Sequence, residues 1–189
     1  ADGEVRDRLQ LLLIREAARA GLLVDDLLAM ARIDAGLALE RGPVELLGLA
    51  LSEAERTRLL APSLRVAVTG HPVTVHGDGG RLSQVLVNLL DNARRHTPAD
   101  GEITISVDLA APGRARVRVA DSGPGVPEQD RERIFDRLVR LDEARAREAG
   151  STAGGAGLGL AIARGIARAH GGELRCAADS VFELTLPTG

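Results

Sequence analysis

The chain has 189 residues and a formal net charge of −3, with 44% hydrophobic and 27% charged residues, a balance typical of a soluble globular protein. All 24 basic residues are Arg, and the absence of Lys excludes a Walker A nucleotide site, a eukaryotic-type protein kinase and Schiff-base chemistry. Because the charge is slightly acidic and two Phe are the only aromatic residues, we expect no nucleic-acid partner.

Cysteine content and hydropathy limit the chain further. Cys176 is the only cysteine, which excludes an internal disulfide and a cysteine-rich zinc site. No stretch reaches the roughly 20 apolar residues of a membrane span, and no signal peptide opens the chain. We therefore expect a soluble, cytoplasmic domain that makes no membrane contact itself.

Residues 2–35 predict one long helix, which contains no Pro and ends at Gly36. Its first apolar stripe alternates spacings of four and three, as in a coiled coil, and consists of Leu13, Ala17, Ala20, Val24, Leu27 and Ala31. Leu23, Met30 and Leu37 form a second stripe beside it. Two adjoining stripes suit a helix in a bundle, so we expect this helix to need a partner helix.

The segment around Arg41-Gly42-Pro43 predicts a boundary between a first part, residues 1–41, and a second domain, residues 42–189. In the second domain the patterns predict helices at 46–61, 79–95 and 158–170, with Asp78 as an N-cap, and a short helix that ends near Phe135. They predict strands at 65–69, 73–76, 103–109 and 115–119, and two more near the C-terminus. This mixture predicts an α+β two-layer sandwich.

The first candidate site is NLLDNARRHTP, residues 88–98. Asn88 and Asn92 lie four apart on the predicted helix, so both amides project from one face, and Arg95 and His96 follow one turn later. Amides among Leu side chains must be hydrogen-bonded or face a ligand. The alternative is that both are exposed polar residues of an amphipathic helix.

Two glycine-rich segments follow. In DSGPGVP, residues 121–127, Gly123 and Gly125 allow close backbone approach to a flat ligand, and Asp121 at the strand end could accept a hydrogen bond from an exocyclic amine. The alternative is a plain turn. In GGAGLG, residues 154–159, the glycines open a helix whose N-terminal N–H groups could bind phosphate. A Rossmann turn is excluded there because no strand precedes these glycines.

In this order and spacing, the three segments resemble the N, G1 and G2 boxes of bacterial sensor histidine kinases, within the gyrase/Hsp90/MutL-type ATPases. The F box corresponds to Ile134-Phe135-Asp136-Arg137, and the resemblance covers residues 43–187. Upstream, LVDDLLAMARIDAG, residues 23–36, resembles the second helix of the family's dimerisation and phosphoacceptor domain. The resemblance implies a Bergerat-type ATP-binding fold, in which helices cover one face of a mixed sheet.

The resemblance also implies a role for each site residue. Asn92 would coordinate Mg²⁺, and Asp121 would select ATP over GTP because adenine presents a donor where guanine presents an acceptor. Residues 140–153 would form a lid. The implied nucleotide contacts are Asn88, Asn92, Arg95, His96, Asp121, Gly123, Gly125, Phe135, Gly155, Gly157, Leu158 and Gly159.

Asn88 indicates the reaction type, since hydrolysing relatives have a Glu at this position. An amide cannot take a proton from water, so hydrolysis should be slow and the γ-phosphoryl kept for another acceptor. The family's phosphoacceptor, a His followed by an acidic residue and then Arg and Pro, is absent. His71, His76, His96 and His170 precede Pro, Gly, Thr and Gly, so this chain should not phosphorylate itself.

We therefore expect a histidine kinase module that binds Mg·ATP and transfers the γ-phosphoryl to a histidine on a dimerisation helix of its homodimeric parent. The parent would be an inner-membrane sensor with a response regulator as partner. The first alternative is a nucleotide-binding scaffold without transfer activity. The second is a serine kinase of the anti-sigma type, which lacks a dimerisation helix, so the stripe that begins at Leu13 argues against it. The family usually has Phe where Leu138 stands.

Overall fold

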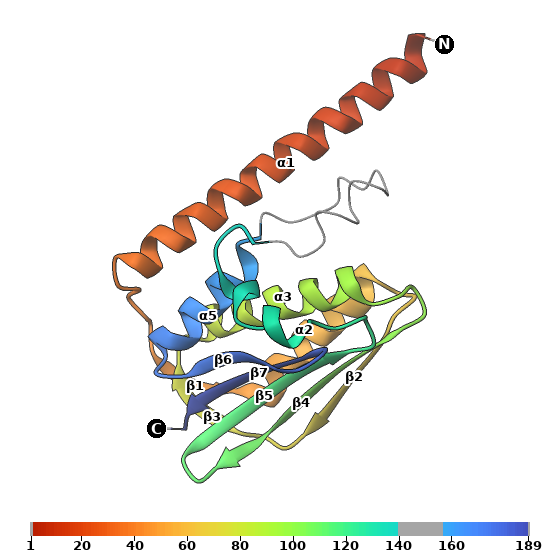
Figure 1. The fold of residues 1–189 in the computed structure, drawn as a ribbon. Helices are drawn as coiled ribbons and strands as arrows, with labels where there is room; N and C mark the ends of the chain where they lie inside the picture. Colours follow the sequence, from red (N-terminus) through yellow and green to blue (C-terminus); the bar gives the residue numbers. More distant parts are fainter. Residues whose placement is uncertain (1, 140–156, 189) are drawn as a thin grey trace.

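The computed structural model describes residues 2–139 and 157–188, which form a two-layer sandwich with one long helix beside it (Figure 1). The helices are α1 (Asp2–Asp34), α2 (Leu46–Leu60), α3 (Gly79–His96) and α5 (Gly159–Ala169), and two short 3-10 turns are η1 (Glu128–Asp130) and η2 (Arg133–Phe135). The strands are β1 (Gly42–Glu45), β2 (Arg65–Gly70), β3 (Thr74–Gly77), β4 (Glu102–Ala111), β5 (Arg114–Asp121), β6 (Glu173–Ala178) and β7 (Val181–Pro187).

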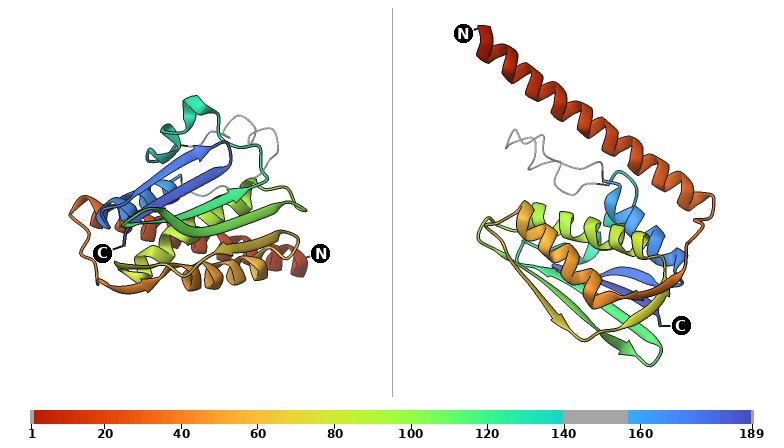
Figure 2. Two further views of the ribbon diagram at one scale, coloured as in Figure 1. Left: turned by 90° about the horizontal axis from the view of Figure 1, so that it is seen from below. Right: turned by 180° about the vertical axis from the view of Figure 1, so that it is seen from behind.

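The main sheet has five strands in the order β2-β4-β5-β7-β6. β2 pairs with β4 in parallel, with Val66 opposite Ile103, whereas the other three pairs are antiparallel, so the sheet is mixed. β1 and β3 form a separate two-stranded antiparallel sheet. Figure 2 shows that α2, α3 and α5 all lie on one face of the five-stranded sheet.

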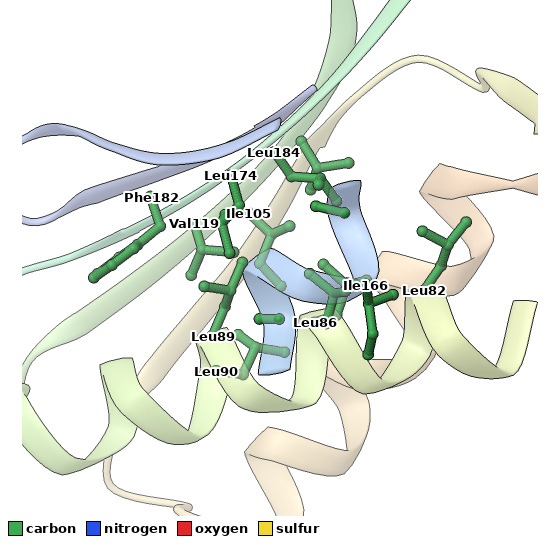
Figure 3. Close-up of a cluster of buried hydrophobic side chains, with 14 of the residues drawn as sticks. Leu82, Leu86, Leu89, Leu90, Ile105, Val119, Ile166, Leu174, Phe182 and Leu184 are labelled. Carbon is green, nitrogen blue, oxygen red and sulfur yellow. The ribbon is translucent and has the colours of Figure 1, made fainter. Parts of the chain in front are cut away.

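The core lies between that sheet and its helices, because apolar residues alternate along each strand. On β4, Ile103, Ile105 and Val107 are buried, whereas Thr104 and Ser106 point to the other face. α3 contributes Leu82, Val85, Leu86, Leu89, Leu90 and Ala93 from one side. In Figure 3, Leu86 and Leu89 face Ile105, Val119 and Leu184 of the sheet and Ile166 of α5.

The opposite face of the sheet is polar and centres on Glu183, whose side chain is 3% exposed. Its carboxylate accepts hydrogen bonds from Arg118 Nε at 2.8 Å and from Arg175 Nη2 at 2.6 Å. Burial alone would raise the pKa of Glu183, but the hydrogen bonds and charges of the two Arg lower it overall. A shallow concavity of about 370 Å³ lies on this face, next to Arg118, Ala120 and Val181.

α1 packs on the sandwich chiefly through residues near its C-terminal end. Ala29 and Met30 are buried, and Ile33 lies against α5, where a Cβ on Gly165 would be 2.8 Å from the Ile33 side chain. Asp34 pairs with Arg137 at 2.5 Å. Towards its N-terminus, α1 projects away from the sandwich (Figure 1). The first predicted stripe is exposed there: Leu13 is 70%, Val24 55% and Leu27 59% exposed.

The predicted α+β sandwich is confirmed, and its long helices lie within one or two residues of their predicted bounds. Two details were wrong. β1, from Gly42 to Glu45, was not predicted, because its four residues acquire strand structure only by pairing with β3. The helix predicted to end near Phe135 is a pair of separate 3-10 turns. Among the described residues, none of the helices combines the length and the hydropathy that a membrane crossing requires.

Candidate functional site

Helix α3, which carries the first predicted site segment, lies next to the described parts of the other two segments. Asn88 Nδ2 on α3 donates to the carbonyl oxygen of Gly159, the first residue of α5, at 3.0 Å. His96, at the end of α3, lies near enough to Asp121 for its charge to act on that carboxyl. Residues 25 and 71 positions apart along the chain therefore lie next to each other.

α3 carries the polar side of this site because its other side is fixed in the core. Asp78 caps the helix by accepting from the Arg81 N–H at 3.0 Å, and the buried Leu residues set the rotation of the helix. That rotation leaves Asn88 and Asn92 half-buried. The interpretation of both as freely exposed residues therefore fails for Asn88, whose amide bonds to α5.

Arg95 and His96 are exposed at the C-terminal end of α3. Burial and the charge of Asp25 raise the pKa of Asp26 on α1, and the positive charge of Arg95 opposes that rise. Arg95 therefore lies near Asp26 of α1.

Asp121 ends β5 and is half-buried. Burial raises the pKa of its carboxyl, while the Gly123 N–H, donated to Oδ1 at 2.8 Å, and the charge of His96 act in the opposite direction. A Cβ on Gly123 would be 2.6 Å from the His96 carbonyl oxygen. The glycine therefore lets the loop lie against the end of α3, which fixes the carboxylate next to His96.

Gly125 has φ +75°, and a Cβ there would lie 2.7 to 2.8 Å from atoms of Asp179, in the turn between β6 and β7. Several hydrogen bonds connect that turn to the loop after β5. Arg131 donates to both segments, to Asp179 in the turn and to the Val126 carbonyl oxygen in the loop. None of the three predicted site segments contains Asp179, Ser180 or Arg131. The Asp-Ser pair between two short strands indicates a turn, but nothing local indicates what the turn contacts.

The N-terminus of α5 differs from those of α2 and α3. Glu45 and Asp78 cap the latter two with side-chain carboxylates, whereas Leu158, the N-cap of α5, makes no side-chain capping bond. Gly157, at φ +72°, accepts from the Leu138 N–H at 3.0 Å and leads the chain into the helix. This 11-residue helix receives no side-chain cap from the described residues, and its N-terminal N–H groups and positive dipole end suit a phosphate.

Phe135 belongs to the core in this structure. It is 5% exposed, packs edge-to-face on Phe182 at 6.3 Å between centroids, and lies under the Arg164 guanidinium at 5.1 Å. Leu138 is 67% exposed, with a positive φ of 62°. Gly155 and the predicted lid, residues 140–153, lie outside the described residues.

The residues present fit a magnesium ion held chiefly by a nucleotide. Within residues 2–139 and 157–188, no cluster of three His, Cys, Asp or Glu side chains comes together. A cation at Asn92 would take one amide oxygen from the chain and the rest from phosphate and water, which is a usual set for Mg²⁺. The uncapped N-terminus of α5 would face the same phosphates.

His170, which precedes Gly171-Gly172, has a structural role. It is 3% exposed, its Nδ1 lies 2.8 Å from the Ile166 carbonyl oxygen, and its Nε2 accepts from the Asp78 N–H at 3.0 Å. It therefore caps α5 and joins that helix to the start of α3.

A family model and several curated relatives match this chain. The family described as "Histidine kinase-, DNA gyrase B-, and HSP90-like ATPase" matches residues 77–189. The chain is 38% identical over 177 residues to the probable sensor histidine kinase TcrY of Mycobacterium tuberculosis, covering 91% of this chain and 36% of TcrY. It is 36% identical to the histidine-protein kinase/phosphatase MprB of Mycobacterium avium over 88% of this chain and 30% of MprB.

Two solved structures are similar in fold. Full-length ShkA in complex with AMPPNP matches with a TM-score of 0.77 and 31% identity, covering 96% of this chain and 39% of ShkA. The mycobacterial sensor histidine kinase MprB matches with a TM-score of 0.66 and 31% identity, covering 78% of this chain and 97% of that one. The chain spans about a third of the length of the curated relatives TcrY and MprB. It belongs to the histidine kinase-, DNA gyrase B- and HSP90-like ATPase family, as the catalytic domain of a sensor histidine kinase.

Proposed function

We propose that this chain binds Mg·ATP at the site between α3, the Asp121 loop and the N-terminus of α5, and that it transfers the γ-phosphoryl group to a histidine outside the chain. The observation that carries the proposal is that α3 joins a half-buried carboxylate, Asp121, which lies near His96, to the N-terminus of α5, where Asn88 bonds to Gly159 and the described residues supply no side-chain cap. The first suits an amine donor and the second a phosphate. That ShkA was solved with AMPPNP supports a nucleotide here.

Each residue then has a part in the reaction. Asp121 accepts from the adenine amine, Arg95 and His96 line the nucleotide, and the backbone around Gly157 and Gly159 donates to phosphate oxygens. Asn92 holds Mg²⁺, which neutralises charge on the phosphates. Asn88 can orient a water molecule but cannot deprotonate it, because an amide takes up no proton. Its Nδ2 already donates to the Gly159 carbonyl oxygen.

The helix α1 is the proposed second helix of a dimerisation region, and residues 42–189 are the catalytic domain. The exposed stripe that includes Leu13, Val24 and Leu27 suits pairing with the helix that carries the acceptor histidine. We extend the proposal to a homodimeric inner-membrane parent, with this domain on the cytoplasmic side, and to a response regulator as the next acceptor.

The binding step is tested by calorimetric titration with Mg·ATP and Mg·GTP. We expect tighter binding of ATP, and we expect Asp121→Ala to lose a charge-assisted hydrogen bond that contributes about 1.5–3 kcal/mol. Equal affinity for the two nucleotides, with no effect of the substitution, would contradict the role of Asp121.

The transfer step is tested by acid-labile radiolabel from ATP. The chain alone should acquire none, because His96 lies at the nucleotide and His170 is buried as a cap. Addition of a helical fragment with the family's acceptor histidine should give label on the fragment, since pairing along α1 supplies proximity. Binding without any transfer to the fragment would favour the alternative of a regulatory scaffold.

A further inference from the structure

The turn between β6 and β7 holds the loop that carries Asp121 at three places. Asp121 N–H donates to the Ser180 carbonyl oxygen at 3.1 Å, and Val126 N–H donates to the Asp179 carbonyl oxygen at 2.5 Å. Between them, Ser180 Oγ donates to the Gly123 carbonyl oxygen at 3.2 Å. The loop is therefore held at its start, middle and end by a turn more than 50 residues away in the sequence.

Arg131 bonds both to this turn and to the loop that carries Asp121. Its Nη2 donates to Asp179 Oδ1 at 2.6 Å, and its Nε lies 3.4 Å from the Val126 carbonyl oxygen. The Arg131 side chain is 25% exposed, whereas that of Asp179 is 84% exposed. The guanidinium is thus largely enclosed, while the carboxylate it pairs with reaches out from the turn.

The two segments also touch directly. Gly125 leaves no room for a side chain, because a Cβ would lie 2.7 Å from Asp179 Cβ and 2.8 Å from its carbonyl carbon. The thiol of Cys176 on β6 lies in the same cluster: burial raises its pKa, the charge of Arg131 lowers it, and the charges of Asp179 and Asp121 raise it. The carboxylate of Asp121 therefore shares one small region with the Arg131–Asp179 pair.

We propose that Arg131 and Asp179 are positioning residues for nucleotide specificity, which hold the Asp121 carboxylate where it can accept a hydrogen bond from the exocyclic amine of adenine. The inference rests on the proposed role of Asp121. Neither residue touches the nucleotide. They act by fixing the loop, because a hydrogen bond weakens steeply when its distance and angle drift.

The readout is the ratio of dissociation constants for Mg·ATP and for the Mg²⁺ complex of purine riboside triphosphate, which lacks only the amine. We expect the wild-type chain to prefer ATP by about tenfold or more, the value of one hydrogen bond to a charged group. Arg131→Gln and Asp179→Asn should each reduce that ratio by about three- to tenfold, by weakening ATP binding while leaving the analogue unchanged. The double variant should lose no more than either single one, since both break the same pair.

Arg133→Gln is the matched control, because Arg133 pairs with Asp130 in a nearby exposed ion pair that does not include the loop. It should retain the wild-type ratio. Arg131→Lys, which keeps the charge next to Asp179, should recover most of the preference and guards against a simple loss of folding. Thermal unfolding of each variant, followed by circular dichroism, shows that the ratios come from folded chains.

The outcomes separate the two proposals. If the wild-type chain prefers ATP and Asp121→Ala removes that preference, but Arg131→Gln and Asp179→Asn retain it, the positioning role is overturned and the role of Asp121 stands. If the variants weaken both nucleotides equally, the pair serves the fold and not specificity, which also overturns the inference. If the wild-type chain has no preference and Asp121→Ala changes nothing, the proposed contact with adenine is itself wrong.

Discussion

The two glycine-containing segments of the site differ in what requires their glycines. In the loop after β5, a Cβ on Gly123 would lie 2.6 Å from the His96 carbonyl oxygen, and one on Gly125 would lie 2.7 Å from Asp179. Before α5, Gly157 is similarly crowded, with Val139 O at 2.9 Å, but a Cβ on Gly159 would meet nothing closer than the Asn88 amide at 3.6 Å. Packing against the described residues thus explains the first three glycines and does not require the fourth, Gly159.

The largest effect should come from Gly125→Ala, which tests whether folding requires that glycine. We expect it to lower the free energy of unfolding by about 2–4 kcal/mol, because it combines a positive φ with a backbone clash. Gly113→Ala is the matched control: its φ of +77° is almost the same, but the space around it is open, so it should lose only about 1 kcal/mol. Equal losses in urea denaturation would mean that the contact with Asp179 contributes nothing.

The next effect concerns the two amides of α3. Asn92→Ala should weaken Mg²⁺-dependent ATP binding by about 1.5–3 kcal/mol, as expected for the loss of a charged ligand contact, whereas Asn88→Ala should weaken it far less. Asn88 instead bonds to Gly159, so its loss should appear chiefly as about 1 kcal/mol of stability. Titrations with and without EDTA measure the metal-dependent part, and a wild-type affinity that EDTA leaves unchanged would refute the metal role.

Gly159→Ala tests the glycine that packing does not explain. Folding should be unaffected or slightly improved, since Ala favours a helix, but ATP affinity should fall by about tenfold if the phosphates approach this backbone closely. Gly79→Ala is matched to it, because Gly79 also begins a helix and its Cβ would lie 3.6 Å from the nearest side chain, that of Val44. Both variants are measured by thermal unfolding and ATP titration. Unchanged ATP affinity in Gly159→Ala would leave that glycine without a function.

The smallest effect should come from Asp121→Asn. Burial raises the pKa of Asp121 above its ordinary value of 3.8. A carboxyl with a raised folded-state pKa favours the fold when protonated, so its charge destabilises the folded chain at neutral pH, and this cost disappears as the pH falls towards 3.8. Asp121→Asn should therefore raise the free energy of unfolding at pH 7 and raise it less near pH 4, while ATP binding weakens.

Glu183→Gln should change the free energy of unfolding at pH 7 in the opposite direction to Asp121→Asn. The pKa of Glu183 is lowered overall, so its charge stabilises the folded chain above its ordinary pKa, and this stability is lost as the pH falls through the folded-state value. The substitution should destabilise the chain at pH 7 and have less effect in acid. A shared sign for both variants would show that the environment of Asp121 is not the one described above.

Local sequence predicted the elements whose causes are local. Asp78 and the apolar spacing after it placed the third helix at 79–95, and α3 runs from Gly79 to His96. The parallel pairing of β2 with β4 could not be predicted in this way, because it joins strands on either side of α3. The short strand from Gly42 to Glu45 was missed for the same reason, since only its contact with β3 defines it.

The same division applies to the site. The motifs themselves, at Asn88, Asp121 and Gly159, could be identified along the chain, and their order suggested that they act together. The contact between Arg131 and Asp179 beside the Asp121 loop could not be predicted from the sequence. The two residues stand 48 positions apart, and each has the sequence context of an ordinary surface charge. Their importance depends on the twist and pairing of β6 and β7, which bring the turn to the loop.

The shape of α1 has a mechanical consequence. A helix of 33 residues is about 50 Å long, and this one packs on the sandwich chiefly near one end, where Ile33 meets Gly165 and Asp34 meets Arg137. It is therefore a lever with its fulcrum on α5: a tilt of about 5° displaces the free end by about 4 Å while the fixed end barely translates. Arg137 immediately precedes Leu138, whose N–H is bonded to the Gly157 carbonyl oxygen, so the second contact of α1 is linked to the residues just before α5. A force applied near the N-terminus of α1 therefore acts on the contacts that Ile33 and Asp34 make with the sandwich.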